Sequence, residues 1–171
     1  GQEMFRNTGA VDQNENEIGE YGTLTELSGR VPCRGSGMQF DGNPFIPSFL
    51  GQVNDAGVAV RNGYCFIIYL PDGHGGAVAD RGGKPPAADE KAAFLQQARY
   101  IAYAWPQGKN RTGARAFATT EQGLIWSTPI FNFEGPDDPP SWNDLLDDTD
   151  GDGDRDWQDE PGHEGWISMD W

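Results

Sequence analysis

Short apolar segments separated by glycine and proline are the dominant pattern of the chain. Tyr64 to Leu70 reads YCFIIYL and is bounded by Asn62-Gly63 and Pro71-Asp72-Gly73, which predicts a strand. This segment is apolar on both faces, so we expect a central, covered strand. Further strands are predicted at residues 99–105, 114–119 and 124–127. A short glycine-containing turn joins the last two and predicts a hairpin.

Helix signals are few and short. Thr23 and Glu26 form the T-x-x-E capping pattern in TLTELSG, which predicts a short helix that ends at Gly29. A second short helix is predicted from Asp89 to Gln97, with two acidic residues in its first turn. Residues 71–88 are rich in glycine and proline and predict a long excursion from the sheet. The pattern as a whole predicts an α+β fold with a small antiparallel sheet, short helices and long loops.

Charge divides the chain into two parts. The net charge is −15, and from Glu134 to Trp171 there are fourteen acidic residues and one basic residue, Arg155. A chain of 171 residues fits one core, so we expect a globular head at 1–134 and an acidic C-terminal segment at 135–171 that packs on it. Such a surface repels phosphate groups, so nucleic acid and anionic lipid headgroups are not expected partners.

Alternating aspartates form the most specific motif. Residues 148–159 read DTDGDGDRDWQD, with aspartates at positions 1, 3, 5, 7, 9 and 12 and Gly153 at position 6, the register of an EF-hand calcium loop. Carboxylates arranged around a glycine-permitted turn supply the hard oxygen ligands that Ca²⁺ prefers, and position 7 offers its backbone carbonyl. The predicted metal ligands are Asp148, Asp150, Asp152, Asp154, Asp156 and Asp159.

The match to a complete EF-hand is partial. Arg155 replaces the usual apolar residue, Asp159 replaces the usual glutamate, and Pro161 follows almost at once. We therefore expect a lone calcium loop without flanking helices, and three tryptophans to attach it to the domain: Trp157, Trp166 and Trp171. The alternative is a solvated acidic tail that binds no ion. Seven carboxylates in residues 147–159 repel one another without a cation, which predicts disorder when calcium is removed.

The chain has two cysteines, Cys33 and Cys65. A sparse, even count without CxxC spacing is typical of one structural disulfide in an oxidising compartment, and two buried reduced thiols are the alternative. With a disulfide, the protein is expected to be extracytoplasmic. No stretch of about 20 apolar residues is present.

Catalytic signals are weak. His74 and His163 are the only histidines, and no HExxH, GxSxG or CxxC motif occurs. Paired carboxylates with tryptophans that stack on sugars are conceivable in a glycosidase, but tryptophans in a small β domain are more often part of the core. We expect no enzyme, and a hydrolase is the least favoured alternative.

A series of short motifs follows in order between residues 2 and 128. The end of a helix (QEMFRN) is followed by a G-x-Y-G-x-L-x-x-L element at Gly19–Leu27, then by G-Y-x-F, A-x-P, T-G-x-R-x-F and G-x-I elements. These later elements start at Gly63, Ala104, Thr112 and Gly123. Their order and spacing resemble those of type IV pilin-like and pseudopilin-like proteins of bacteria. The apolar N-terminal helix that anchors such proteins in the membrane is not part of this sequence.

The resemblance implies a pilin-like head and a structural function. The chain would be the ectodomain of a subunit of a type IV pilus-like filament or type II secretion pseudopilus, at the periplasm or cell surface. Its partners would be other pilin or pseudopilin subunits, and it would meet the membrane only through the missing helix. Major pseudopilins also use calcium near the C-terminus, which is compatible with the loop. The alternative function is a secreted calcium-dependent adhesin, or a module that binds glycans or proteins.

Overall fold

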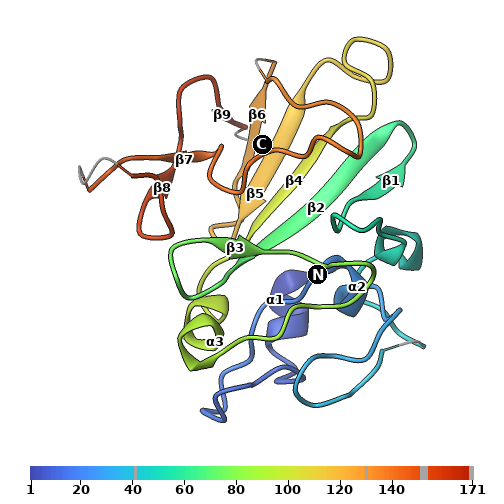
Figure 1. Cartoon of the computed structure of the whole chain (residues 1–171), viewed down its shortest axis with the longest axis vertical. Coiled ribbons are helices and arrows are strands. Elements are labelled where there is room, and N and C mark those ends of the chain that lie inside the picture. Colours follow the sequence, from blue (N-terminus) through green and yellow to red (C-terminus); the bar gives the residue numbers. More distant parts are fainter. Residues whose placement is uncertain (41, 130, 151–153, 170–171) are drawn as a thin grey trace.

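An antiparallel sheet organises the whole molecule (Figure 1). The computed structural model describes residues 1–40, 42–129, 131–150 and 154–169, and within these ranges the sheet has seven strands. Its order is β1-β2-β4-β5-β6-β9, and β3 pairs with β2 beside that path. The strands are β1 (Ala59–Arg61), β2 (Tyr64–Pro71), β3 (Ala77–Val78), β4 (Ile101–Pro106), β5 (Ala116–Thr120), β6 (Ile125–Thr128) and β9 (Ile167–Met169).

The predicted α+β, pilin-like fold class is wrong. The helices in the described part of the chain are short: α1 (Gln2–Arg6), α2 (Leu24–Leu27), α3 (Glu90–Gln96) and the 3₁₀ turn η1 (Ser48–Gly51). Glycine and proline interrupt the segments between them too often for a long helix to form. The sheet is also larger than predicted, because β1, β3 and β9 add to the four expected strands. The fold is therefore β-rich.

The local predictions agree closely with the structure. All four expected strands form, and β5 and β6 make the expected hairpin. The helix α2 begins with the predicted capping box, in which Glu26 Oε2 accepts a hydrogen bond from the Thr23 backbone N–H at 3.0 Å. Gly29 follows with a φ of 68°, a left-handed conformation that glycine adopts without strain.

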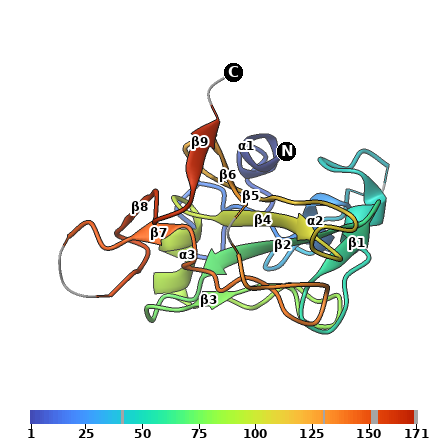
Figure 2. The same cartoon turned by 90° about the horizontal axis from the view of Figure 1, so that it is seen from above.

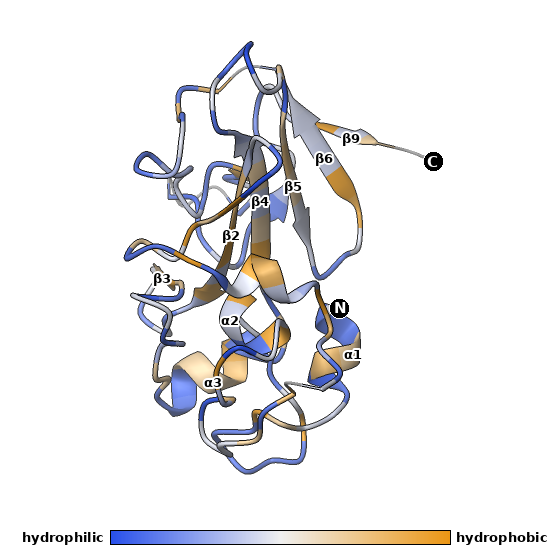
Figure 3. Cartoon of the chain, turned by 90° about the vertical axis from the view of Figure 1, so that its right-hand side faces the viewer, coloured by the Kyte–Doolittle hydropathy of each residue, from blue (hydrophilic) through white to orange (hydrophobic). Residues whose placement is uncertain are grey.

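Both faces of the sheet are covered, as predicted for β2. Alternate side chains of β2 and β4 enter two separate cores, because successive residues of a strand point to opposite faces. Figure 3 shows apolar residues concentrated along these strands and polar residues in the loops. We call the first the C-face core, because side chains from the C-terminal part of the chain, such as Phe131 and Trp166, pack in it. We call the second the N-face core, because side chains from the N-terminal part, such as Phe5 and Leu27, pack in it.

The two cysteines lie in different cores, so the disulfide prediction is wrong. Cys65 belongs to the C-face core and Cys33 to the N-face core, and both are buried free thiols. The sheet stands between them, and its thickness prevents the approach that a disulfide requires. Burial raises the pKa of both thiols to about 11, so they stay protonated at neutral pH.

The N-face core contains a buried ion cluster around Arg34. Its guanidinium pairs with Glu26 and lies 3.3 Å from the Glu20 carboxylate. It also donates to the Tyr21 carbonyl at 2.7 Å and to the Gln96 side chain at 3.0 Å. One arginine thus binds the loop before α2, the helix α2 itself and α3 together.

The C-terminal segment contributes to the sheet and the C-face core. β9 pairs antiparallel with β6, with Ile167 opposite Ser127, and extends the sheet at one edge (Figure 2). Leu145, Trp157 and Trp166 are buried with the strands of the predicted head. None of the described helices is long and apolar enough to span a bilayer.

Candidate metal centre

A two-stranded ladder closes the acidic loop. β7 (Leu146–Asp147) pairs antiparallel with β8 (Glu160–Pro161), with Leu146 opposite Pro161 and Asp147 opposite Glu160. The ladder therefore encloses residues 148–159, the same twelve that carry the EF-hand register. This hairpin projects from one side of the molecule in both Figure 1 and Figure 2. Strands thus take the place of the flanking helices of an EF-hand.

Three of the predicted ligands converge. Asp148, Asp150 and Asp159 each offer a carboxylate oxygen, and these oxygens all lie within 4.8 Å of one another. Two oxygens on opposite sides of a Ca²⁺ ion, each bonded at about 2.4 Å, have a similar separation. Asp148 and Asp159 meet because the ladder brings the two ends of the loop together. The cluster can hold a divalent cation.

Asp159 is the most firmly fixed of the three. It is 2% exposed, and its Oδ1 accepts hydrogen bonds from the Thr149 backbone N–H at 2.7 Å and the Thr149 hydroxyl at 3.0 Å. Its Oδ2 accepts from the Asp156 backbone N–H at 2.8 Å. Burial raises the pKa of this carboxyl, but hydrogen bonds to its charged form outweigh burial and lower the pKa below its ordinary value. The carboxylate is therefore charged and ready to bind a cation.

None of the other predicted ligands that the structure describes belongs to this cluster. Asp156 is not among the three clustered groups, and its Oδ1 accepts a hydrogen bond from the Gln158 backbone N–H at 2.7 Å. Asp154 is exposed and lies outside the cluster, although its predicted ligand is the backbone carbonyl. Asp152 lies outside the described residues. The structure thus brings together three of the six predicted ligands.

Trp157 attaches the loop to the rest of the protein. Its ring is 7% exposed and stacks on Trp142, with centroids 4.9 Å apart and planes inclined by 13°. Its indole N–H donates to the Gly76 carbonyl at 2.8 Å. Trp166 is buried in the same core, as expected, whereas Trp171 lies outside the described residues. The loop is therefore tied to the turn that follows β2.

Thr149 was not predicted from the sequence. It supports Asp159 with two hydrogen bonds, and its hydroxyl also accepts from the Glu160 backbone N–H at 3.3 Å. Its position in the sequence could have indicated this role, since a threonine between two aspartates at the start of a loop can form local hydrogen bonds with its side chain. Its partner, ten residues away in the chain, is defined only by the closed hairpin.

The two histidines lie elsewhere. His163 Nδ1 is 3.6 Å from the Asp147 carboxylate, at the foot of the hairpin, and is not among the three clustered groups. His74 is exposed and pairs with Asp89 at the start of α3. Neither histidine lies beside a nucleophilic side chain in the described hydrogen-bond pattern.

Fold and site together define a class: a β-rich protein with a strand-closed acidic loop suited to a cation. Comparison with known proteins adds no narrower assignment, since no family model, curated protein or solved structure matches the chain.

Proposed function

We propose that residues 148–159 bind one calcium ion, and that this ion fixes the C-terminal layer of a non-enzymatic β domain. The observation that carries the proposal is the convergence of Asp148, Asp150 and Asp159 at the two ends of a loop closed by strands. All three groups are hard oxygen donors. Calcium accepts six to eight such ligands in flexible geometry, whereas magnesium requires a near-ideal octahedron at shorter distances.

The ion would stabilise more than the loop. Its binding would offset the repulsion among the clustered carboxylates and hold the β7–β8 hairpin closed. Trp157 extends from this loop to the Gly76 carbonyl and the Trp142 ring. Calcium would therefore order the surroundings of the β2–β3 turn as well as the loop.

Calcium titration of the whole protein tests the proposal. At a calcium concentration a hundredfold above Kd, binding adds about 2.7 kcal/mol to the free energy of unfolding. For a domain of this size, that corresponds to a rise in Tm of roughly 5 to 10 °C. Tryptophan fluorescence should change in parallel, because Trp157 is part of the loop and Trp142 stacks on it. Magnesium should give a much smaller rise in Tm at equal concentration.

Two variants with the same charge change sharpen the test. Asp150→Asn removes a charge from the cluster and should weaken calcium binding roughly tenfold or more, because affinity depends on ligand charge. Asp154→Asn, in the same loop but outside the cluster, should weaken it much less. Equal effects of the two variants, or no change in Tm at millimolar calcium, would contradict the proposal.

A binding module is the second candidate function, and one observation favours it. An open groove with an exposed aromatic ring lies beside α3, far from the acidic loop in the sequence. The role as a filament or pseudopilus subunit stays a prediction supported by the sequence motifs. Its decisive test is whether purified protein co-assembles with pilin or pseudopilin subunits.

A further inference from the structure

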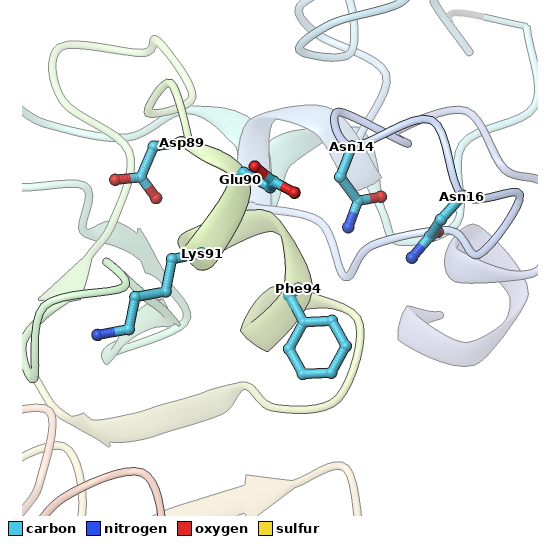
Figure 4. A pocket seen from close by; sticks show the side chains of 6 residues that line it. All are labelled: Asn14, Asn16, Asp89, Glu90, Lys91 and Phe94. Atoms are coloured by element: carbon cyan, nitrogen blue, oxygen red, sulfur yellow. The ribbon is translucent and has the colours of Figure 1, made fainter.

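A groove beside α3 joins two parts of the chain that are distant in sequence. It has a volume of about 640 Å³ and opens to solvent. One wall is the loop that carries Asn14 and Asn16, and the other is the first turns of α3 with Phe94 (Figure 4). The six lining residues are Asn14, Asn16, Asp89, Glu90, Lys91 and Phe94.

The loop wall is held in place from beneath by Gln97. This side chain is 5% exposed, and its amide nitrogen donates to Asn14 Oδ1 at 3.0 Å and Asn16 Oδ1 at 2.9 Å. Its amide oxygen accepts from Asn16 Nδ2 at 3.1 Å, and its nitrogen also contacts the Ile18 carbonyl at 3.0 Å. A buried side chain thus sets the positions of both asparagines, so the groove is already formed without a ligand.

The helix wall is fixed by Asp89. Its Oδ1 caps α3 by accepting from the Ala92 backbone N–H at 2.8 Å, and its Oδ2 lies 2.9 Å from His74 Nε2. Asp89 is therefore engaged in structure. By contrast, Glu90 and Lys91 make no ion pair or side-chain hydrogen bond within the described residues, and Phe94 is 64% exposed. In Figure 4 the Glu90 carboxylate points toward Asn14, whereas the Lys91 ammonium group points away from both asparagines. The groove therefore combines a free carboxylate and an aromatic ring.

We propose that this groove binds a saccharide. The face of an exposed aromatic ring can cover the apolar C–H face of a sugar ring. The Asn14 amide nitrogen can donate to a hydroxyl group, and the Glu90 carboxylate can accept from one. Phe94 supplies an apolar surface, and Asn14 and Glu90 supply polar groups beside it, which is the combination that small-molecule sites use.

The charges of the groove favour an uncharged sugar over a phosphate ligand. Asp89 and Glu90 outnumber Lys91, and the whole chain carries −15, so anionic ligands are repelled. This inference names the ligand class of the second proposed function, and it does not depend on calcium in the acidic loop.

Direct binding of neutral oligosaccharides tests the inference. The full chain would be titrated with chitotetraose, cellotetraose and maltotetraose, separately, by calorimetry and by NMR, with calcium and with a chelator. We expect saturable binding of at least one of the three at millimolar or lower concentration. We also expect shifted amide signals at Asn14, Asn16 and α3. No saturable binding of any of the three, or shifts confined to other regions, would overturn the inference.

A matched pair of phenylalanine variants locates the site. Phe94→Ala should weaken binding of that oligosaccharide by about tenfold, the effect expected from losing a stacked ring. Phe49→Ala removes a ring that is 38% exposed and lies over Arg61 instead, so it should leave affinity unchanged. Equal affinities of the Phe94→Ala variant and the unchanged protein would overturn the inference, provided that both have the same circular dichroism spectrum.

The two proposals can fail separately. Sugar binding that persists in chelator, in a protein whose Tm does not respond to calcium, would reject the ion and retain the groove. A calcium-dependent Tm without sugar binding would reject the groove and retain the ion.

Discussion

The two faces of the sheet accommodate acidic residues in different ways. On the N-face, Glu20 and Glu26 are fully buried and share the guanidinium of Arg34. On the C-face, the core is built from aromatic and aliphatic side chains, and the acidic groups gather in a loop at its rim. The N-face thus contains its own cation, whereas the C-face loop is suited to a cation from solution. Stability of the first should be independent of ions, and stability of the second should depend on them.

Replacing Arg34 should have the largest effect. Arg34→Met leaves two buried carboxylates without their cation, which costs about 3 to 5 kcal/mol of the free energy of unfolding. Urea denaturation in the presence of chelator measures this loss. Arg30→Met is the control, because Arg30 is exposed and should change the free energy by less than about 0.5 kcal/mol. Similar losses for both variants would show that the buried cluster has no special role.

Calcium removal should affect one face more than the other. Hydrogen exchange of backbone amides measures local opening, and chelator should accelerate exchange at Leu145, Trp157 and Trp166 on the C-face. Amides of α2 on the N-face should exchange at unchanged rates. A uniform acceleration across both faces would contradict the division, because it would mean that the ion stabilises the domain only globally.

One hydrogen bond of Trp157 connects the loop to the rest of the protein, and its loss should lower the stability. Trp157→Phe keeps a ring but loses the donor to the Gly76 carbonyl, which should cost about 1 kcal/mol. The matched control is Trp126→Phe, because the buried Trp126 N–H has no partner within the described residues. Thermal denaturation of both variants, with and without calcium, compares them. A larger loss for Trp126→Phe would argue against the proposed connection.

The smallest effect should be a pH dependence from Asp80 on the N-face. Burial raises the pKa of this carboxyl above its ordinary value of 3.8, although hydrogen bonds from Thr25 partly oppose the shift. Because the folded pKa exceeds the unfolded one, Asp80 stabilises the fold below pH 3.8. This contribution is lost as the pH rises through the raised value.

Asp80→Asn should remove that contribution. We would measure the free energy of unfolding of variant and parent in chelator across mildly acidic pH. The difference between the two should change between pH 3.8 and the raised pKa of Asp80, and it should be constant above that pKa. A difference that is constant throughout would show that Asp80 does not titrate in the folded protein.

Local patterns decided which segments form strands and helices, and they were sufficient for that purpose. The apolar run at 64–70 predicted β2 with both faces covered, and the capping pair Thr23 and Glu26 predicted α2. Aspartate spacing likewise predicted the boundaries of the acidic loop, which the β7–β8 ladder encloses. These features depend on residues that are neighbours in the chain, so their physical causes are visible in the sequence.

Long-range pairing decided the rest. The sequence carried no signal that β9 would pair with β6, nor that Cys33 and Cys65 would lie on opposite faces. It also did not reveal that Arg34 would neutralise Glu20 and Glu26, or that Gln97 would set the groove. Each of these contacts joins segments brought together by the folded sheet. The sequence by itself determined the number and spacing of carboxylates in the acidic loop. Only the closed hairpin decided which of these carboxylates lie close together.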